Sequence, residues 1–274
     1  MPELPEVETV RRTLAELVIG KTIEQVDVGW AKMIKRPDDV DQFKWLLKGQ
    51  TIRSMGRRGK FLLFHLDDYT LVSHLRMEGR YGLYQQNESV AKHTHVRFVF
   101  GDGTELRYQD VRKFGTMHLF QSGREQMEPP LAKLGVEPFS DQFSAKLLTE
   151  RLSKTSRKIK SALLDQGIIV GLGNIYVDEA LFRARIHPER LAKDVTVAEV
   201  KILHQAILNT LTEAVNLGGS SIKSYVNGQG EMGMFQQRLD VYGRKGETCR
   251  QCGTPITKTV VGGRGTHFCS VCQK

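Results

Sequence analysis

Apolar and polar residues follow two different periods along this chain, and the change of period divides it. Between Val7 and Leu17, four apolar residues recur at three- and four-residue spacing with charged residues between them. This pattern is typical of an amphipathic helix, which we expect over about 5–18, ended by Gly20. Over about 22–120 the apolar runs become short and are separated by turn residues, which predicts strands.

The strand region contains five segments of strand-like composition: 51–53, 61–66, 70–75, 95–100 and 104–108. Gly101-Asp102-Gly103 lies between the last two and is a strong hairpin signal. Several short strands with turns between them predict a β-sandwich or a barrel.

A segment rich in glycine and proline, 121–140, predicts a linker. Beyond it, helical spacing returns in three stretches, which start near Phe143, Ile159 and Val200. Two glycines end the last stretch, and the following residues, about 219–236, predict a loop because they are rich in Gly, Ser, Gln and Met. About 35 residues then remain and form a separate cysteine module.

Composition points to a partner. The 274 residues leave room for two domains. Forty Lys and Arg against 31 Asp and Glu give a net charge of +9 and a pI near 9.4, which favours a polyanion, nucleic acid before membrane. No apolar run has the length of a membrane span, and no secretion signal opens the sequence. We therefore expect a cytoplasmic protein.

The four cysteines form two Cys-x2-Cys pairs separated by sixteen residues: Cys249, Cys252, Cys269 and Cys272. Two such knuckles complete a tetrahedral four-sulfur site, and a closed site of this kind holds structural zinc. The ion should support a hairpin whose tip is formed by 260–266. Arg264 lies between glycines there, where it is either a phosphate ligand or a solvated loop residue.

The first six residues offer a nucleophile that arises by processing. Removal of Met1 would leave Pro2 with a secondary amine, and α-amino groups titrate at about pH 7.7–8.0. Such an amine can attack an aldehyde-level carbon and form an iminium, while Glu3 and Glu6 can transfer protons. The same residues also suit an ordinary helix start, because Pro5 fits the first turn and acidic residues favour the positive helix end.

Three further segments carry candidate chemistry. Gly173 and Asn174 form a turn into a helix that suits phosphate binding within a helix–turn–helix element, or a simple N-cap at Asn174. Met77 and Phe114 lie on turns where they could enter a base stack, although burial preference alone favours core positions. Lys60 ends a basic turn that is either solvated or in contact with phosphate.

These motifs together resemble the formamidopyrimidine-DNA glycosylase family. The matching segments are Pro2–Thr9, Arg57–Phe61, Ser73–Gly79, Asp110–Thr116, Gly173–Tyr176 and the terminal zinc finger. The resemblance covers the whole chain in order. It implies an α+β fold with three parts: an N-terminal helix and β-sandwich domain (2–130), a helical helix-two-turn-helix domain (131–237) and a zinc-finger hairpin (238–274). The domains would form a clamp with DNA in its cleft.

The resemblance also implies a bifunctional reaction on duplex DNA that contains oxidised purines or abasic sites. Pro2 would displace the flipped base at C1′ and form an imine, with Glu3 as proton donor. β- and δ-elimination would then cut the strand, with Lys60 as proton donor in the first elimination and Arg264 in the second. One structural zinc ion and a monomer are implied as well.

Nine residues are expected to contact DNA or the lesion: Glu6, His74, Met77, Glu78, His93, Arg112, Phe114, Lys160 and Asn174. Met77, Arg112 and Phe114 match residues that fill the void left by the flipped base and contact the estranged cytosine. His74, His93, Lys160 and Asn174 match backbone contacts. Glu78 would lie near the lesion, which the loop 219–236 would cap.

Three other functions compete with this one. An enzyme of the endonuclease VIII type, for oxidised pyrimidines, shares the nucleophile but places its void-filling residues on one loop, whereas Met77 is separated here from Arg112 and Phe114. A zinc-finger protein that only binds DNA would be supported by loss of Pro2 or Glu3, and both are present. An N-terminal-proline tautomerase is excluded by chain length, basic charge and the zinc module.

Overall fold

The computed structural model describes residues 1–220 and 233–274, so most of the predicted loop 219–236 lies outside the described residues. The chain divides into two compact units, residues 1–133 with 218–233 and residues 134–217 with 234–274. The boundary after Lys133 falls inside the segment predicted as the linker. Each unit is described by itself below.

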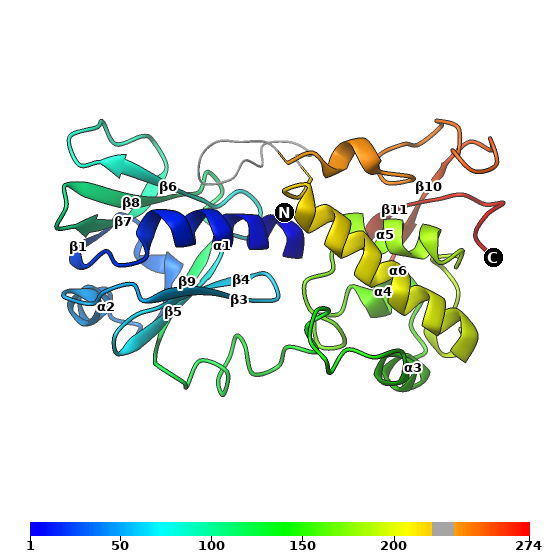
Figure 1. The fold of residues 1–274 in the computed structure, drawn as a ribbon, viewed down its shortest axis with the longest axis horizontal. Coiled ribbons are helices and arrows are strands. Elements are labelled where there is room, and N and C mark those ends of the chain that lie inside the picture. Colours follow the sequence, from blue (N-terminus) through cyan, green and yellow to red (C-terminus); the bar gives the residue numbers. More distant parts are fainter. Residues whose placement is uncertain (221–232) are drawn as a thin grey trace. The chain divides into compact units, whose positions relative to one another are not determined.

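Two β-sheets and two α-helices make up the N-terminal unit (Figure 1). The four-stranded sheet has the order β1-β7-β8-β6: β1 (Ile23–Val28), β7 (Thr94–Phe100), β8 (Thr104–Gln109) and β6 (Arg80–Gln85). The five-stranded sheet has the order β2-β9-β5-β4-β3: β2 (Ile34–Arg36), β9 (Thr116–Gln121), β5 (Tyr69–His74), β4 (Phe61–His65) and β3 (Ser54–Arg58). Only β2 and β9 pair in parallel among these strands.

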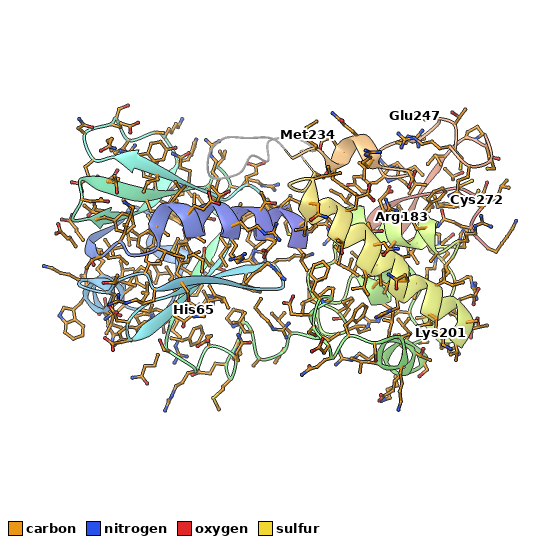
Figure 2. The ribbon with its side chains drawn as sticks, in the orientation of Figure 1. His65, Arg183, Lys201, Met234, Glu247 and Cys272 are labelled. Carbon is orange, nitrogen blue, oxygen red and sulfur yellow. The ribbon has the colours of Figure 1, made fainter. Side chains whose placement is uncertain are left out.

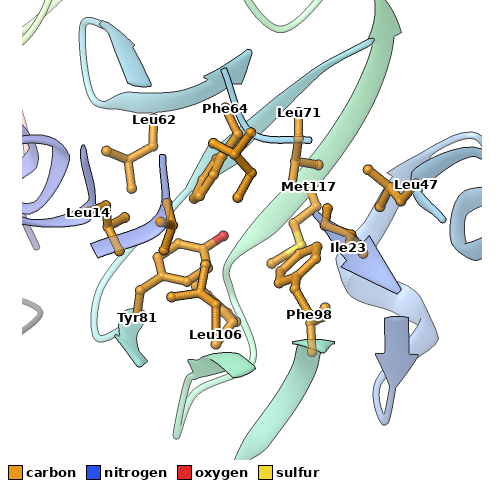
Figure 3. Close-up of a cluster of buried hydrophobic side chains, with 14 of the residues drawn as sticks. Leu14, Ile23, Leu47, Leu62, Phe64, Leu71, Tyr81, Phe98, Leu106 and Met117 are labelled. Carbon is orange, nitrogen blue, oxygen red and sulfur yellow. The ribbon is translucent and has the colours of Figure 1, made fainter. Parts of the chain in front are cut away.

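Helices α1 (Leu4–Val18) and α2 (Val40–Leu47) and the 3-10 turn η1 (Ala31–Met33) complete this unit. Apolar residues of both sheets, α1 and α2 form one hydrophobic core (Figure 3): Leu14, Ile23, Leu47, Leu62, Phe64, Leu71, Tyr81, Phe98, Leu106 and Met117. Burying each of the larger of these side chains contributes about 1.5–3 kcal/mol. The predicted N-terminal helix and sandwich are therefore confirmed.

Two local predictions differ from the structure. The segment 51–53 forms only an isolated bridge between Thr51 and Thr22, and β3 begins at Ser54. Helix α2 was not predicted, because it is eight residues long and lies between short strands. Its start is nevertheless encoded locally, since the Asp39 side chain accepts hydrogen bonds from the backbone N–H groups of Asp41 and Gln42.

The second unit is mainly helical. It contains α3 (Ala145–Ser153), α4 (Ile159–Leu163), η2 (Ala192–Asp194), α5 (Asn174–Arg183), α6 (Val197–Asn216), η3 (Phe235–Arg238) and a hairpin of β10 (Thr257–Val261) and β11 (Arg264–Phe268). Helix α5 packs against both α6 and β11. A capping box between Thr196 and Glu199 begins α6. No described helix has the length and apolarity needed to cross a membrane.

Candidate active site and metal centre

The N-terminus of α1 is held by a reciprocal capping box. Glu3 is the N-cap, its side chain accepts from the backbone of Glu6, and the Glu3 N–H donates to Glu6 Oε2 at 2.7 Å. Glu6 Oε1 also accepts from the Ser220 N–H at 2.7 Å. Pro2, Glu3 and Glu6 are all buried. The structure thus gives Glu6 main-chain partners on both of its oxygens, and its contact with DNA or the lesion stays a prediction.

Strand register brings several predicted residues to one end of the five-stranded sheet. Phe61 pairs with His74, so Lys60 in the β3–β4 turn lies at the same edge as the end of β5. His74 in turn pairs with Thr116, which places the start of β9 there too. The first turns of α1 reach this edge because Glu8 forms an ion pair with Arg57 of β3 at 3.2 Å.

His74 is neutral near pH 7. Burial, followed by the nearby cations Arg76 and Lys60, lowers its pKa to about 3. The Arg76 N–H donates to His74 Nδ1 at 2.9 Å, so the proton of the neutral ring is on Nε2. Phe61 packs edge-on against the imidazole with ring centroids 4.5 Å apart. The ring is therefore a fixed neutral donor suited to a phosphate oxygen.

Met77, Arg112 and Phe114, which match the residues that fill the void and contact the estranged cytosine, are all exposed. Met77 has 39% of its surface accessible and Phe114 has 51%, so the expectation from burial preference was wrong for both. Asp110 shapes the second turn, because its carboxylate accepts from the N–H groups of Arg112 and Gly115 at 3.0 and 2.8 Å. The Arg112 guanidinium then lies 4.8 Å from the centroid of the Phe114 ring.

Tyr108 packs against both the turn that carries Met77 and the turn that carries Arg112 and Phe114. It is fully buried, and a Cβ atom built on Gly79 or Gly115 would lie 2.1 or 1.8 Å from its hydroxyl oxygen. Gly79 ends the Met77 turn and Gly115 ends the Phe114 turn. Tyr108 is therefore a common support for the two turns. Sequence reasoning missed this role, although both glycines belong to the matched motifs.

The two remaining residues predicted in this unit lie at the same loops. His93 is half-buried, and its carbonyl accepts from the Asp110 N–H at 3.0 Å. Glu78 is exposed in the Met77 turn. The N-terminal unit thus collects Pro2, Glu3, Lys60, His74, Met77, Glu78, His93, Arg112 and Phe114 around the ends of adjacent strands and α1.

The four cysteines form a metal site. Their sulfur atoms all lie within 4.8 Å of one another, with 3.9 Å between Cys249 and Cys272 and 3.5 Å between Cys252 and Cys269; Cys272 is labelled in Figure 2. Zinc–sulfur bonds of about 2.3 Å in a tetrahedron place sulfurs about 3.8 Å apart. Hydrogen bonding from Thr254 lowers the pKa of Cys252 to about 6, whereas burial raises the pKa of Cys269 and Cys272, so the support for zinc comes from the sulfur geometry. The donor set fits zinc.

The zinc hairpin ends in a two-residue turn. Gly262 and Gly263 have φ values of +56° and +74°, as a type I′ turn requires. Val261 pairs with Arg264, which is exposed at the first position of β11. The predicted hairpin with its tip at 260–266 is observed.

Asn174 and Lys160 converge on this hairpin. Both donate to the Gly265 carbonyl oxygen, Asn174 Nδ2 at 2.8 Å and Lys160 Nζ at 3.0 Å. The N-cap of α5 is Gly173, so Asn174 is the first helical residue and the simple N-cap interpretation is wrong. Lys160 is completely buried and forms an ion pair with Asp178 at 2.7 Å. The contact of Lys160 with the DNA backbone stays a prediction.

Family models match the chain in three parts. The formamidopyrimidine-DNA glycosylase N-terminal domain matches residues 1–117, and the H2TH domain of the same glycosylase matches residues 134–226. The chain belongs to the formamidopyrimidine-DNA glycosylase family. The zinc finger found in FPG and IleRS matches residues 246–274, and together with the sulfur geometry it identifies one structural zinc site in this family member.

Whole-chain relatives agree with the family assignment. Formamidopyrimidine-DNA glycosylase of Cytobacillus firmus is 71% identical over 273 residues and is covered completely, as is this chain. The protein of Shouchella clausii is 68% identical, with 100% of this chain and 99% of the relative covered. This member of the formamidopyrimidine-DNA glycosylase family is accordingly an enzyme of base-excision DNA repair, a glycosylase for oxidised purines.

Solved structures of similar chains contain DNA. Lactococcus lactis Fpg bound to DNA with an abasic site has a TM-score of 0.92 and 44% identity, with 99% of both chains covered. MutM bound to DNA with carbocyclic 8-oxo-G has a TM-score of 0.93 and 43% identity, with 100% of both chains covered. These likenesses confirm the predicted α+β fold with its helix-two-turn-helix region and zinc finger.

Proposed function

We propose that the Pro2 amine carries out both reactions of a bifunctional glycosylase/lyase on duplex DNA. The observation that carries this proposal is the start of α1, where Pro2 and the capped Glu3 are buried. The same helix is tied by the Glu8–Arg57 ion pair to β3, which leads into the turn of Lys60 at the edge where His74 ends β5. A side-chain nucleophile is not needed, because an α-amino group titrates at about pH 7.7–8.0 and is partly neutral at pH 7.

The reaction starts with base displacement. The bond between C1′ and the flipped oxidised purine breaks as the Pro2 nitrogen bonds to C1′, and the proton lost by the amine goes to the departing base. Glu3 then protonates the ring oxygen of the sugar, whose bond to C1′ breaks. Opening of the sugar gives an iminium between Pro2 and C1′. The iminium withdraws electrons, so the proton on C2′ becomes acidic and the C3′–O bond can break.

Strand cleavage then uses one cation from each unit. Lys60 protonates the 3′ phosphate that leaves in β-elimination. Loss of the C4′ proton and breakage of the C5′–O bond complete δ-elimination, in which Arg264 protonates the departing 5′ phosphate. Exposure of Arg264 at the hairpin tip supports this role, because a guanidinium on the surface can meet a phosphate.

The void left by the flipped base is filled from the paired turns. Met77 and Phe114 are exposed apolar side chains on supported turns, which suits insertion into a base stack. Arg112 contacts the estranged cytosine, and the neutral His74 binds a backbone phosphate. The relatives bound to abasic-site and 8-oxo-G DNA support double-stranded lesion DNA as the partner. We expect a monomer, since one chain carries every proposed group.

Removal of Met1 is required by this chemistry. While Met1 is attached, the Pro2 nitrogen is an amide and cannot form an iminium. A preparation that keeps Met1 should therefore bind lesion DNA but form no covalent intermediate. Mass spectrometry of the intact protein establishes the processed fraction before any assay.

Borohydride trapping tests the proposal directly. Borohydride reduces an imine to a stable amine, so processed protein mixed with a duplex that contains 8-oxoguanine opposite cytosine should become covalently attached to DNA. Peptide mapping should place the attachment at residue 2, and Pro2→Gly, which still offers an amine, should trap more slowly. Processed, zinc-loaded protein that binds the duplex and never traps would support the DNA-binding protein without catalysis instead.

The same assay separates the purine enzyme from the endonuclease VIII type. A matched duplex with an oxidised thymine should trap poorly, because the void-filling residues occupy two turns in the arrangement expected for a purine enzyme. Equal trapping on both duplexes would contradict the purine preference while leaving Pro2 as the nucleophile.

A further inference from the structure

The main chain next to Arg264 is held by side chains from two helices. The carbonyl of Gly265, the residue that follows Arg264, accepts from Asn174 Nδ2 of α5 at 2.8 Å and from Lys160 Nζ of α4 at 3.0 Å. On the other side of the turn, a Cβ atom on Gly262 would lie 2.5 Å from Ser161 Oγ, so the tip itself lies against α4. The hairpin is therefore docked on the helices at its functional end.

Asp178 completes this support. It is 1% exposed on α5, and its Oδ2 accepts from the backbone N–H of His267 in β11 at 2.8 Å. Its Oδ1 lies 2.7 Å from Lys160 Nζ, and both side chains of this ion pair are fully buried. One carboxylate thus holds β11 directly and also holds the lysine that binds Gly265.

We propose that Asp178 is a positioning residue for Arg264 and, through it, for δ-elimination. The hydrogen bonds to Gly265 and His267 fix the backbone of β11, the strand that begins with Arg264. The position of the Arg264 backbone is therefore fixed when its guanidinium meets the 5′ phosphate. Lys160 transmits part of this effect through its hydrogen bond to the Gly265 carbonyl. This inference rests on the function proposed for Arg264 above.

The predicted consequence is confined to the second cleavage. In δ-elimination the C4′–H bond breaks, its electrons form the conjugated double bond, and the C5′–O bond electrons leave on the phosphate oxygen that Arg264 protonates. Base displacement, imine formation and β-elimination use Pro2, Glu3 and Lys60, which belong to the N-terminal unit. Loss of Asp178 should therefore change the products more than the first steps.

Asp178→Asn is the test variant. Asparagine has the same shape and can still accept from His267, but it removes the carboxylate charge 2.7 Å from the buried Lys160 ammonium. Lys160 must then shift toward water and release Gly265. A displacement of about 1 Å can lower a rate by about a hundredfold, so we expect the ratio of δ-product to β-product to fall by about ten- to a hundredfold.

The assay is a single turnover on an abasic-site duplex, resolved on a denaturing gel. The β-product ends in a 3′ unsaturated aldehyde and the δ-product in a 3′ phosphate, and the two migrate differently. Borohydride trapping in parallel reports the imine, and zinc content reports the folded module. We expect Asp178→Asn to keep trapping and β-elimination within about twofold while δ-product is lost, since a shift at Arg264 does not reach Pro2.

Glu179→Gln is the matched control. Glu179 is the next residue of the same helix, is equally buried, and accepts from the backbone N–H groups of Asp240, Val241 and Tyr242 at 2.8–3.0 Å. It holds the same module but does not touch β11 in the hydrogen bonds described. An equal fall in the product ratio for Glu179→Gln would show that general loosening of the module is responsible and would overturn the proposal.

A second variant tests the proposal in case Asp178→Asn does not fold. The double variant Lys160→Met with Asp178→Asn removes both charges, leaves no buried ion unpaired, and still deletes the bond to Gly265. It should show the same loss of δ-product at full zinc content. A normal product ratio in a zinc-loaded variant would refute the inference alone, whereas wild-type protein that never traps would refute the proposed function.

Discussion

Replacing Gly115 with alanine tests whether Tyr108 supports the turn that carries Arg112 and Phe114. The added Cβ would lie 1.8 Å from the Tyr108 hydroxyl oxygen and 2.7 Å from Cζ. Normal contact needs about 3.5 Å, so the turn or the ring must move by about 1.7 Å. Because the three nearest atoms all belong to Tyr108, one residue explains the whole clash.

The cost should be near the upper end of the range for overpacking, about 3 kcal/mol of unfolding free energy. Tyr108→Phe removes the atom at 1.8 Å and leaves Cζ at 2.7 Å, so the double variant should recover about half of the loss, roughly 1.5 kcal/mol. Gly29→Ala is the control. Its Cβ would meet only ordinary contacts, at 3.7 Å or more, and should cost less than about 0.5 kcal/mol.

Tryptophan fluorescence during urea unfolding is a suitable assay, because Trp30 and Trp45, the two tryptophans of the chain, both lie in the N-terminal unit. Affinity for a lesion duplex should fall with stability in Gly115→Ala and recover in the double variant. Wild-type stability in Gly115→Ala, or a double variant no more stable than the single one, would refute the role of Tyr108.

Three further outcomes are expected. Chelation of zinc should unfold the zinc finger and abolish DNA binding, because structural zinc contributes about 10–16 kcal/mol to folding in finger peptides. Tryptophan fluorescence should stay unchanged, because both tryptophans lie in the N-terminal unit; a change in fluorescence on chelation would contradict this. The buried His74 has its pKa lowered to about 3, so the unfolded chain binds the proton first and stability falls as pH drops below about 6.5, by up to about 1.4 kcal/mol per pH unit. His74→Asn should reduce that slope in urea titrations at pH 7, 6 and 5, while His118, whose pKa burial lowers to about 4, keeps part of it; an unchanged slope would rule out His74 as a source. Arg264→Gln should reduce the salt dependence of lesion binding by about 0.9 in a log–log plot, and an unchanged slope would mean that Arg264 meets no phosphate.

Local pattern accounts for much of the fold. Period predicted a helix over 5–18, which is observed as Leu4–Val18, and the turn residues Gly101–Gly103 predicted a hairpin, which is observed as β7 and β8. Helix α2 was not predicted, because its eight residues carry little periodic signal. Strand order was not predictable, since the neighbours β5 and β9 are far apart in the sequence and pair only through the assembled core.

Parts of the candidate site could likewise be predicted from local sequence, and other parts could not. Cysteine spacing predicted the metal site from the sequence alone, because ligand geometry fixes that spacing. Lys160 could not be placed, because its partner Asp178 lies in another helix and the pair meets only after folding. A lysine read alone is expected to be solvated. The signal that could have found this pair is the acidic dipeptide Asp178-Glu179 inside the otherwise apolar helix α5.

The two interpretations of the N-terminal residues, helix start and catalytic group, describe the same interactions. Glu3 is the N-cap of α1, and its side chain accepts from the backbone three residues further on. This bond satisfies a helix N–H and, at the same time, fixes the carboxyl group next to Pro2. The N–H of Glu3 is fixed in turn by Glu6, whose second oxygen holds Ser220. Helix capping therefore supplies the preorganisation that the proposed proton transfer needs, and a cap without Glu3 would lose both.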